Sequence, residues 1–254
     1  MLYICIPSRN EAQTVGLLLW KIRQVFTSTP REYHLLVGDD ASTDATSDVL
    51  APYSKVLPLT ILRQERHRGY ARTLEDLLRH AVTLSDRPRR DAVVVLHADF
   101  LHDPATIPEL LKKFDSGADL IVAESQGEGA PTRGHRLLRR YAPLLLRRRI
   151  RIPGLRDTVS GFLAMRLSVA KDALPGTGPV LMTDGWAANA ELIARAAAVS
   201  RKVEGVHTLE RYDLLQRPLD YDPWSAAKAL WRTGGSLRIP PRAGGGRPSA
   251  TAAD

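Results

Sequence analysis

Hydrophobic and polar positions divide the first half of the chain into short apolar runs separated by longer segments with helical spacing. Several runs are apolar at consecutive positions, which is typical of strands buried on both faces of a sheet. This alternation predicts an α/β fold, with a Rossmann-like, mostly parallel central sheet flanked by helices. The predicted strands span residues 2–7, 33–39, 59–63, 92–97 and 119–124, and the predicted helices span about 12–25, 44–51, 70–84 and 104–115.

The second half of the chain has a less regular pattern. A basic segment covers residues 131–156, and the stretch "TVSGFLAMR" follows it at 158–166. A helix is predicted at about 186–199 and a strand at 202–207. Residues 240–254 are rich in Gly, Pro and Ala, which predicts a disordered tail.

Composition adds few constraints. Of the 254 residues, 44% are hydrophobic and 25% are charged, as in an ordinary globular domain. Cys5, the single cysteine, lies in an apolar run, so we expect a buried thiol and neither an intramolecular disulfide nor a Cys-cluster zinc site. The sequence contains no apolar run of about 18 residues and no signal-peptide pattern, so we expect a cytoplasmic protein without a membrane span.

Positive charge is concentrated in one block. The net charge is +8, and nine arginines with no acidic residue lie between Pro131 and Arg156. Leucines interleave with these arginines, a pattern that predicts a basic interfacial helix with a break near Pro143. A peripheral membrane surface or a phosphate would suit the block, and a solvated cationic face or a subunit contact is the alternative. Nucleic acid is disfavoured because the block lacks interleaved aromatics.

Polar residues follow the predicted strands. The first four strands end in "PSRNEA", "DDASTD", "QERHRGYA" and "HADFLHDP". In open α/β sheets ligands bind outside the carboxyl ends of the strands, so these residues predict a site at one edge. Neither G-x-G-x-x-G after the first strand nor a P-loop occurs, which disfavours a dinucleotide-dependent dehydrogenase and a P-loop NTPase.

Five segments, in order, resemble family 2 glycosyltransferases of the GT-A fold, most closely the dolichyl- or polyprenyl-phosphate sugar transferase branch. They are "IPSRNEAQTVGLLL", "LLVGDDASTDATSDVL", "RGYARTLEDLLRHA", "HADFLHDPATIPEL" and "TVSGFLAMR", and the resemblance covers about residues 2–210. It implies inverting transfer from a UDP- or GDP-linked sugar to a polyprenyl phosphate at the cytoplasmic membrane face. Residues 1–125 would bind the donor and residues 126–239 the acceptor. A soluble hydroxyl acceptor and a binding-only relative are the alternatives.

The resemblance places donor residues at the first three strand ends. Asn10 and Glu11 match the family's N-E pair, although Glu11 would also suit the start of a helix. The "RGYAR" stretch departs from the "N-x-G-K-G" turn of many relatives, so its arginines are either diphosphate ligands or solvated side chains. The predicted nucleotide contacts are Pro7, Asn10, Glu11, Asp39, Asp40, Arg68, Gly69 and Arg72.

The family's D-x-D motif, which holds a divalent cation, corresponds to His97-Ala98-Asp99. Asp99 is the predicted catalytic metal ligand for Mn²⁺ or Mg²⁺. His97 replaces the first carboxylate, and it is either a second ligand, which would favour Mn²⁺, or a hydrogen-bonding residue. Asp103 precedes a proline, so an N-cap is favoured over ligation.

On the acceptor side the resemblance carries Asp157, Ser160 and Gly161 as binding residues, together with Arg133 and Arg136 for a phosphate. Asp184 precedes a helix and is the candidate general base, with a plain N-cap as the alternative. A lipid phosphate is already an anion and needs no strong base. The role of Asp184 therefore distinguishes the two acceptor types.

Overall fold

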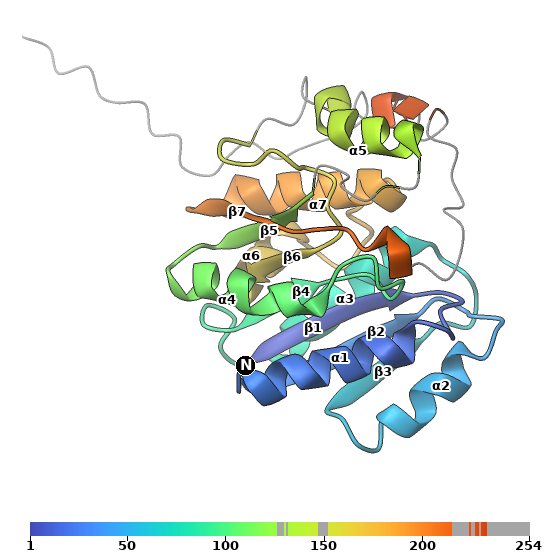
Figure 1. Cartoon of the computed structure of the whole chain (residues 1–254). Helices are drawn as coiled ribbons and strands as arrows, with labels where there is room; N and C mark the ends of the chain where they lie inside the picture. Colours follow the sequence, from blue (N-terminus) through green and yellow to red (C-terminus); the bar gives the residue numbers. More distant parts are fainter. Residues whose placement is uncertain are drawn as a thin grey trace, which may run out of the picture.

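The computed structural model describes residues 1–125, 130, 132–146, 152–214, 224, 227, 228 and 230–232. One seven-stranded sheet with the order β3-β2-β1-β4-β6-β5-β7 forms the centre of this part of the chain (Figure 1). The expected tail at 240–254 lies outside the described residues. The strands are β1 (Leu2–Ser8), β2 (Tyr33–Asp39), β3 (Leu59–Arg63), β4 (Ala92–Val95), β5 (Leu120–Glu124), β6 (Leu163–Arg166) and β7 (Val203–His207).

The sheet is mostly parallel, as predicted. Strand β1 pairs in parallel with β2 and β4, and β5 pairs in parallel with β7. Strand β6 runs antiparallel between β4 and β5 and joins the two parallel groups. All strands except β6 therefore direct their carboxyl ends to the same edge of the sheet.

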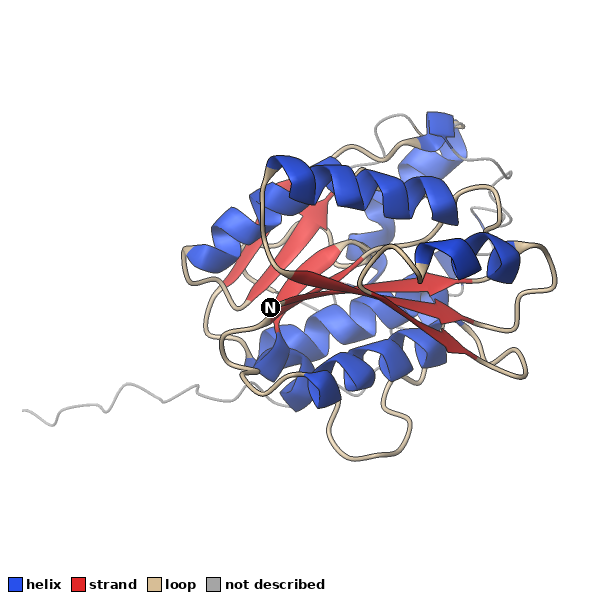
Figure 2. Cartoon of the chain, turned by 90° about the horizontal axis from the view of Figure 1, so that it is seen from below, coloured by secondary structure: helices blue, strands red, loops and turns tan. Residues whose placement is uncertain are grey.

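Helices cover both faces of the sheet (Figure 2). Helices α1, α2 and α4 pack on one face, and α3, α6 and α7 pack on the other. Because both faces are covered, consecutive strand residues are buried: Ile4 and Ile6 face the first helix layer, and Cys5 faces the second. These helices are α1 (Val15–Ser28), α2 (Thr46–Tyr53), α3 (Tyr70–Leu84), α4 (Ile107–Asp115), α6 (Leu167–Ala173) and α7 (Gly185–Val199).

Burial in this core supplies most of the stabilisation. Side chains such as Leu18 on α1 and Leu74 on α3 have no exposed surface, and each contributes about 1.5–3 kcal/mol. Cys5 is likewise fully buried and free, as predicted, and burial raises the pKa of its thiol.

Helix α5 (Arg133–Leu146) forms a further layer on top of α7 (Figure 1). Its inner face places Leu138 and Ala142 against Ala187 and Ala190 of α7. The expected break near Pro143 is wrong, because the helix continues through that position to Leu146. The arginines at 147–149 and 151 lie outside the described residues.

Of the eleven elements with predicted bounds, three match the structure at both ends, and eight differ by one to three residues at one or both ends. Helix α1 begins at Val15 because a turn precedes it, in which the carbonyl of Glu11 accepts from the backbone N–H groups of Thr14 and Val15. Asp103 is the predicted N-cap, since its side chain accepts from the N–H of Ala105 in the short 3₁₀ turn before α4. Strand β6 and helix α6 were not predicted.

Candidate active site

A cavity of about 360 Å³ opens at the carboxyl ends of β1, β2 and β4. This is the switch point of the sheet, where β1 has β2 on one side and β4 on the other, and ligands of open α/β sheets bind at such points. Of the residues predicted for the site, the cavity is lined by Pro7, Glu11, Asp40, His97, Asp99 and Asp184. The remaining lining residues are Ser8, Arg9, His67, Tyr70, Thr73 and Ala98.

Asn10 and Asp39 organise the loops behind this cavity. Asn10 has a φ of 55°, a left-handed conformation that Asn tolerates, and its Oδ1 accepts from the N–H of Thr43 at 2.8 Å. Asp39 is fully buried and accepts from the N–H of Ser42 and the hydroxyl of Ser47. The Asn10 bond ties the loop after β1 to the loop after β2, and the Asp39 bonds hold the loop after β2 in place.

Asp40 holds the loop between β3 and α3. Its carboxylate accepts from the backbone N–H groups of Arg68 at 2.7 Å and Gly69 at 2.9 Å. The Nδ1 atom of His67 lies 2.7 Å from Oδ2 of the same carboxylate. Asp40 is therefore both a wall of the cavity and the anchor of the loop that closes one side of it.

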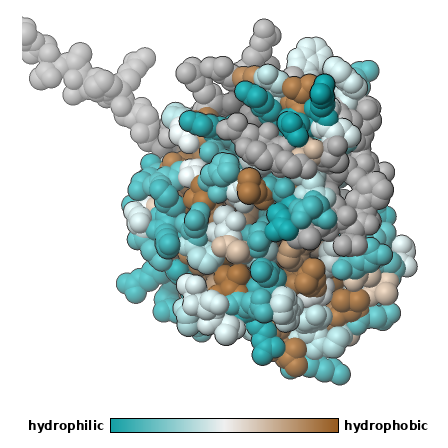
Figure 3. All heavy atoms as spheres, in the orientation of Figure 1, coloured by the Kyte–Doolittle hydropathy of each residue, from teal (hydrophilic) through white to brown (hydrophobic). Residues whose placement is uncertain are grey.

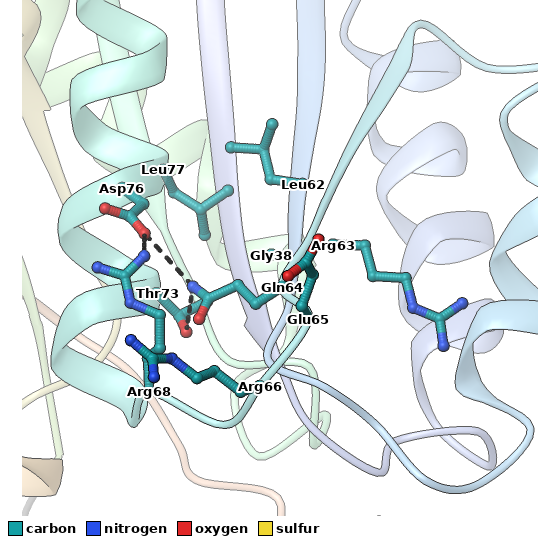
Figure 4. Close-up of a pocket in the computed structure, with 10 residues that line it drawn as sticks. All are labelled: Gly38, Leu62, Arg63, Gln64, Glu65, Arg66, Arg68, Thr73, Asp76 and Leu77. Atoms are coloured by element: carbon teal, nitrogen blue, oxygen red, sulfur yellow. Dashed lines mark hydrogen bonds and ion pairs between the residues drawn. The ribbon is translucent and has the colours of Figure 1, made fainter.

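His67 lines the cavity, whereas other side chains of that loop lie outside it. Figure 4 shows them in a neighbouring pocket of about 340 Å³, where Arg68 and Gln64 both turn toward Asp76 on α3. Arg68 donates to Asp76 at 2.7 Å. Arg72, on the first turn of α3, donates to Glu75 at 3.1 Å. Both arginines are candidate diphosphate ligands, and in this structure both form ion pairs with carboxylates of α3.

Asp184 connects the second half of the chain to this loop. Its Oδ1 accepts from the N–H of Ala71 in the first turn of α3 at 2.9 Å, and it makes no capping bond to its own helix α7. Gly69 has a φ of 91°, and a Cβ there would lie 3.0 Å from Oδ2 of Asp184. Only glycine suits this position, because the backbone is left-handed and the carboxylate is close.

His97 and Asp99 follow β4. The imidazole of His97 stacks on Tyr70, with 4.8 Å between ring centroids and 10° between planes. Burial lowers the pKa of His97, and the Asp99 carboxylate partly opposes this shift. Oδ1 of Asp99 accepts from the N–H of Leu101 at 3.0 Å, which leaves the carboxylate facing the cavity with further acceptor capacity.

Among the described residues, three non-glycine positions have positive φ, and all follow strands that end at the cavity. They are Asn10 after β1, Ala41 after β2 and Phe100 after β4. Such conformations cost of order 1–3 kcal/mol each and persist where the surrounding structure enforces them. Backbone strain of this kind gathers at functional sites, which supports the assignment of this edge.

The acceptor-side segment contains a buried ion-pair triad. Arg139 of α5 donates to both oxygens of Asp157 at 3.0 and 2.7 Å and to Glu210 at 2.7 Å. Burial alone would lower the pKa of Arg139, but the two carboxylates outweigh it and raise the pKa. Arg139 thus belongs to the core rather than to a cationic surface, and Asp157 is already paired.

None of the other predicted acceptor residues lines the cavity at the switch point. Ser160 is buried and bonds to the backbone of Phe162, and Gly161 packs against His97. Arg133 and Arg136 are exposed on α5, and neither lines the cavity at the switch point.

A further cavity of about 290 Å³ opens at the ends of β5 and β7. Arg139, Arg140 and Arg156 line it together with Glu124, Ser125, Asp157 and His207. Sequence reasoning included Arg140 and Arg156 in the basic block but did not single them out. The signal that would have found Arg156 is its place directly before Asp157 in the acceptor segment.

His67 and Tyr70 are among the cavity residues that sequence reasoning did not single out. Tyr70 lies in the "RGYAR" stretch, whose departure from the family pattern was the available signal. No helix among the described residues has both the length and the apolar composition needed to cross a bilayer.

An acidic cavity at the switch point of an open α/β sheet is the architecture of an α/β nucleotide-binding enzyme. The model of the family "Glycosyl transferase family 2" matches residues 3–174. The chain belongs to this family and is a glycosyltransferase.

Curated relatives are similar at low identity. A dolichol-phosphate mannosyltransferase of Pyrococcus furiosus is 25% identical over 173 residues, which are 66% of this chain and 47% of that protein. A dodecaprenyl-phosphate galacturonate synthase of Rhizobium johnstonii is 27% identical over 124 residues, 48% of this chain and 35% of that protein. The chain spans less than half the length of both.

Solved structures show the GT-A fold. Mannosyl-3-phosphoglycerate synthase from Rubrobacter xylanophilus has a TM-score of 0.64 at 16% identity, over 93% of this chain and 73% of that one. Glucosyl-3-phosphoglycerate synthase from Mycobacterium tuberculosis, in complex with Mn²⁺, UDP and glucosyl-3-phosphoglycerate, has a TM-score of 0.61 at 18% identity, over 94% of this chain and 81% of that one.

Proposed function

We propose that this glycosyltransferase moves a sugar from a UDP- or GDP-linked donor to a polyprenyl phosphate, with inversion at the anomeric carbon. The observation that carries the proposal is the cavity in which Asp99, Asp184, Glu11 and Asp40 meet at the switch point of the sheet. The names of the relatives support it, since two of them act on polyprenyl phosphates, and a related structure holds UDP with Mn²⁺.

The residues of the cavity suit a divalent cation that shares its ligands with a diphosphate. Mg²⁺ and Mn²⁺ in nucleotide sites usually take one or two carboxylates plus phosphate oxygens. Among the described residues no three side chains form a complete metal cage, and Asp99 offers a carboxylate at the cavity wall. Asp99 would hold the cation, which would neutralise charge on the departing nucleoside diphosphate.

The donor nucleotide would lie along β1 and β2. Pro7, Glu11 and Asp40 form this wall, so they are the proposed contacts. Asn10 and Asp39 would act indirectly, by holding the loops described above. Arg68 and Arg72 would reach the diphosphate only by leaving Asp76 and Glu75.

The acceptor phosphate would enter from the side of α5. Arg140 and Arg156 line the cavity beside Asp157, and the planar fork of arginine suits phosphate. Leu137, Tyr141 and Leu144 are about half exposed on the outer face of α5, near the exposed Arg133 and Arg136. In Figure 3 apolar and hydrophilic side chains lie side by side over this helix. Such a surface suits an anionic bilayer, where the lipid acceptor resides.

A hydroxyl acceptor is the second candidate, and Asp184 is the observation that favours it. Its carboxylate lines the cavity with Asp99, which is where a general base would be needed. A phosphate acceptor requires no such base, so the two candidates predict different effects at this residue.

Thermal unfolding with UDP, GDP and their sugars, each with and without Mn²⁺, tests the proposal. A specific nucleotide at a hundredfold excess over its Kd would stabilise the fold by about 2.7 kcal/mol, and the gain would depend on Mn²⁺. Asp99→Asn should abolish the dependence on Mn²⁺, because the amide is a weak cation ligand. Asp103→Asn, a change at a nearby cap, should preserve it. Equal dependence in the wild type and Asp99→Asn would overturn the proposed site.

A further inference from the structure

The two places where this sequence departs from the family pattern touch each other. Tyr70 occupies the stretch in which many relatives carry a Gly-rich turn, and His97 replaces the first carboxylate of D-x-D. Their rings stack at 4.8 Å and 10°, although the residues belong to different elements. The contact brings the two departures together at one place in the structure.

Tyr70 covers a face of the His97 ring, and the edge formed by Nε2 and Cδ2 faces Gly161 of the acceptor segment. A Cβ on Gly161 would lie 2.2 Å from Nε2 and 2.4 Å from Cδ2 of His97. Real Cβ atoms do not approach so closely, so the ring fills the space that the missing side chain leaves. His97 is thereby held between Tyr70 and the backbone at Gly161.

A chain of hydrogen bonds also connects Tyr70 to the segment that contains Gly161. The hydroxyl of Tyr70 donates to Oδ1 of Asn189 on α7 at 2.6 Å, and Nδ2 of Asn189 donates to the carbonyl of Val159 at 3.3 Å. Burial raises the pKa of Tyr70, so the hydroxyl keeps its proton and remains a donor. The chain links α3 to the same acceptor segment that Gly161 belongs to.

We propose that His97 is a positioning residue, which with Tyr70 fixes residues 158–162 against the wall of the cavity that contains Asp99. We call this set of Tyr70, His97, Gly161 and Asn189 the clamp. The inference rests on the proposed function, since it assigns the cavity to sugar transfer. The gain is geometric: a displacement of about 1 Å between reacting groups can cost on the order of a hundredfold in rate.

The clamp accounts for the loss of a carboxylate at position 97. An aspartate has no ring to stack on Tyr70, and it would leave the space beside Gly161 empty. Cation binding would then rest on Asp99 and the diphosphate. His97 would act on the acceptor side, and removing either ring should affect acceptor use while cation binding is preserved.

The test compares His97→Leu, Tyr70→Leu and the double variant, with Tyr70→Phe as the matched control. Calorimetric titration of Mn²⁺ in the presence of UDP, and separately GDP, should give affinities within about twofold of the wild type for all four. Release of nucleoside diphosphate is then followed with undecaprenyl phosphate in vesicles. The kcat/KM for this acceptor should fall about tenfold or more in each Leu variant, with the donor KM within about twofold.

Three comparisons distinguish the clamp from separate effects. The double Leu variant should lose no more than the worse single one, because contacting residues are not additive. Tyr70→Phe, which keeps the stack, should lose less than Tyr70→Leu. Gly161→Ala should unfold at a lower temperature than the wild type, and His97→Ala should lessen that loss in the double variant.

Specific results would overturn the inference. Mn²⁺ affinity reduced about tenfold in His97→Leu but not in Tyr70→Leu would make His97 a ligand. Losses that multiply in the double variant would also refute the clamp. If Asp99→Asn leaves Mn²⁺ binding intact, the proposed function fails instead, and the cation titration shows this without any acceptor.

Discussion

Carboxylates that line the cavity also accept hydrogen bonds from the backbone. Asp40 accepts two backbone N–H groups of the loop before α3, and Asp184 accepts one from α3 itself. Hydrogen bonds to a charged group contribute about 1.5–3 kcal/mol. Removing such a side chain would therefore disturb loop geometry as well as chemistry, and Asn is the informative substitution because its carbonyl can still accept.

Asp184→Asn distinguishes the acceptor types. The amide can keep the bond from Ala71 but cannot accept a proton as a base. If the acceptor is a polyprenyl phosphate, kcat with undecaprenyl phosphate should fall less than about tenfold, whereas loss of a general base would cost about 10²–10⁴-fold. Steady-state rates at saturating donor measure this. A loss of a thousandfold, with the melting temperature unchanged, would favour the hydroxyl acceptor.

His102 predicts a pH dependence of stability. It is buried beside Phe162, its Nδ1 has no hydrogen-bond partner, and burial together with His97 and Arg139 lowers its pKa to about 3. The folded state therefore binds no proton at His102 between pH 6.5 and 3, whereas the unfolded chain does. Stability from this residue is complete above pH 6.5 and is lost as the pH falls, by about 2 kcal/mol at pH 5.

Urea unfolding at pH 7 and pH 5 measures this effect in the wild type and in His102→Phe. The phenylalanine keeps the ring contact with Phe162 and cannot titrate, so its loss of stability between the two pH values should be smaller by about 2 kcal/mol. The quantity compared is the change in unfolding free energy between the two pH values, so any pH-independent cost of the substitution cancels. The same loss in both proteins would show that His102 does not titrate in this way.

At the residue scale the structure brings part of the predicted site together around one cavity. Six of the predicted residues line it, because the carboxyl ends of parallel strands meet at one edge whatever the order of the strands. The roles of arginines were not predictable. In the sequence, nothing distinguishes Arg139 from the other arginines of the basic block. Its partner Glu210 is 71 residues away in the chain.

At the element scale, α5 carries apolar residues on two faces. Leu138 and Ala142 are buried against α7, and Leu137, Tyr141 and Leu144 are exposed. Exposed Trp231, close in sequence to the buried Leu230 that packs with α5, adds a residue typical of membrane interfaces. The buried face explains how the helix is held, and the exposed face is the one that the proposed function assigns to a bilayer.

Vesicle flotation tests the outer face of α5. Arg133→Ala together with Arg136→Ala should weaken binding to anionic vesicles about 30-fold, since each arginine near the surface contributes about 1 kcal/mol. Neutral vesicles should bind the wild type weakly. Leu17→Ser on α1, where Leu17 is also about half exposed, is the control and should bind normally. Equal flotation on neutral and anionic vesicles would contradict the electrostatic part of the prediction.

The hydrophobic pattern of the sequence did not predict two short elements. Strand β6 has four residues and α6 has seven, and they follow one another without an intervening loop. A single apolar run of that length fits a strand or a helix equally well. What makes β6 a strand is its pairing with β4 and β5, which only the tertiary structure supplies.

At the scale of the whole molecule, the two cavities share one edge of one sheet. The cavity at the switch point lies at β1, β2 and β4, and the arginine-lined cavity lies at β5 and β7. The α/β class of the fold and the mostly parallel character of its sheet could be predicted from the alternation of strands and helices. The antiparallel direction of β6 could not be predicted, because no local signal sets the direction of a strand.

Strand β6 also imposes an order on the assembly of the sheet during synthesis. Its partner β4 ends at Val95, and β6 begins only at Leu163. At about 5–20 residues per second, translation of the intervening stretch takes roughly 3–14 seconds. During that interval β4 is an unpaired edge whose side chains, Val93 to Val95, are entirely apolar. Such an edge is a template for pairing with other chains, so we expect the nascent chain to be most prone to aggregation before β6 emerges.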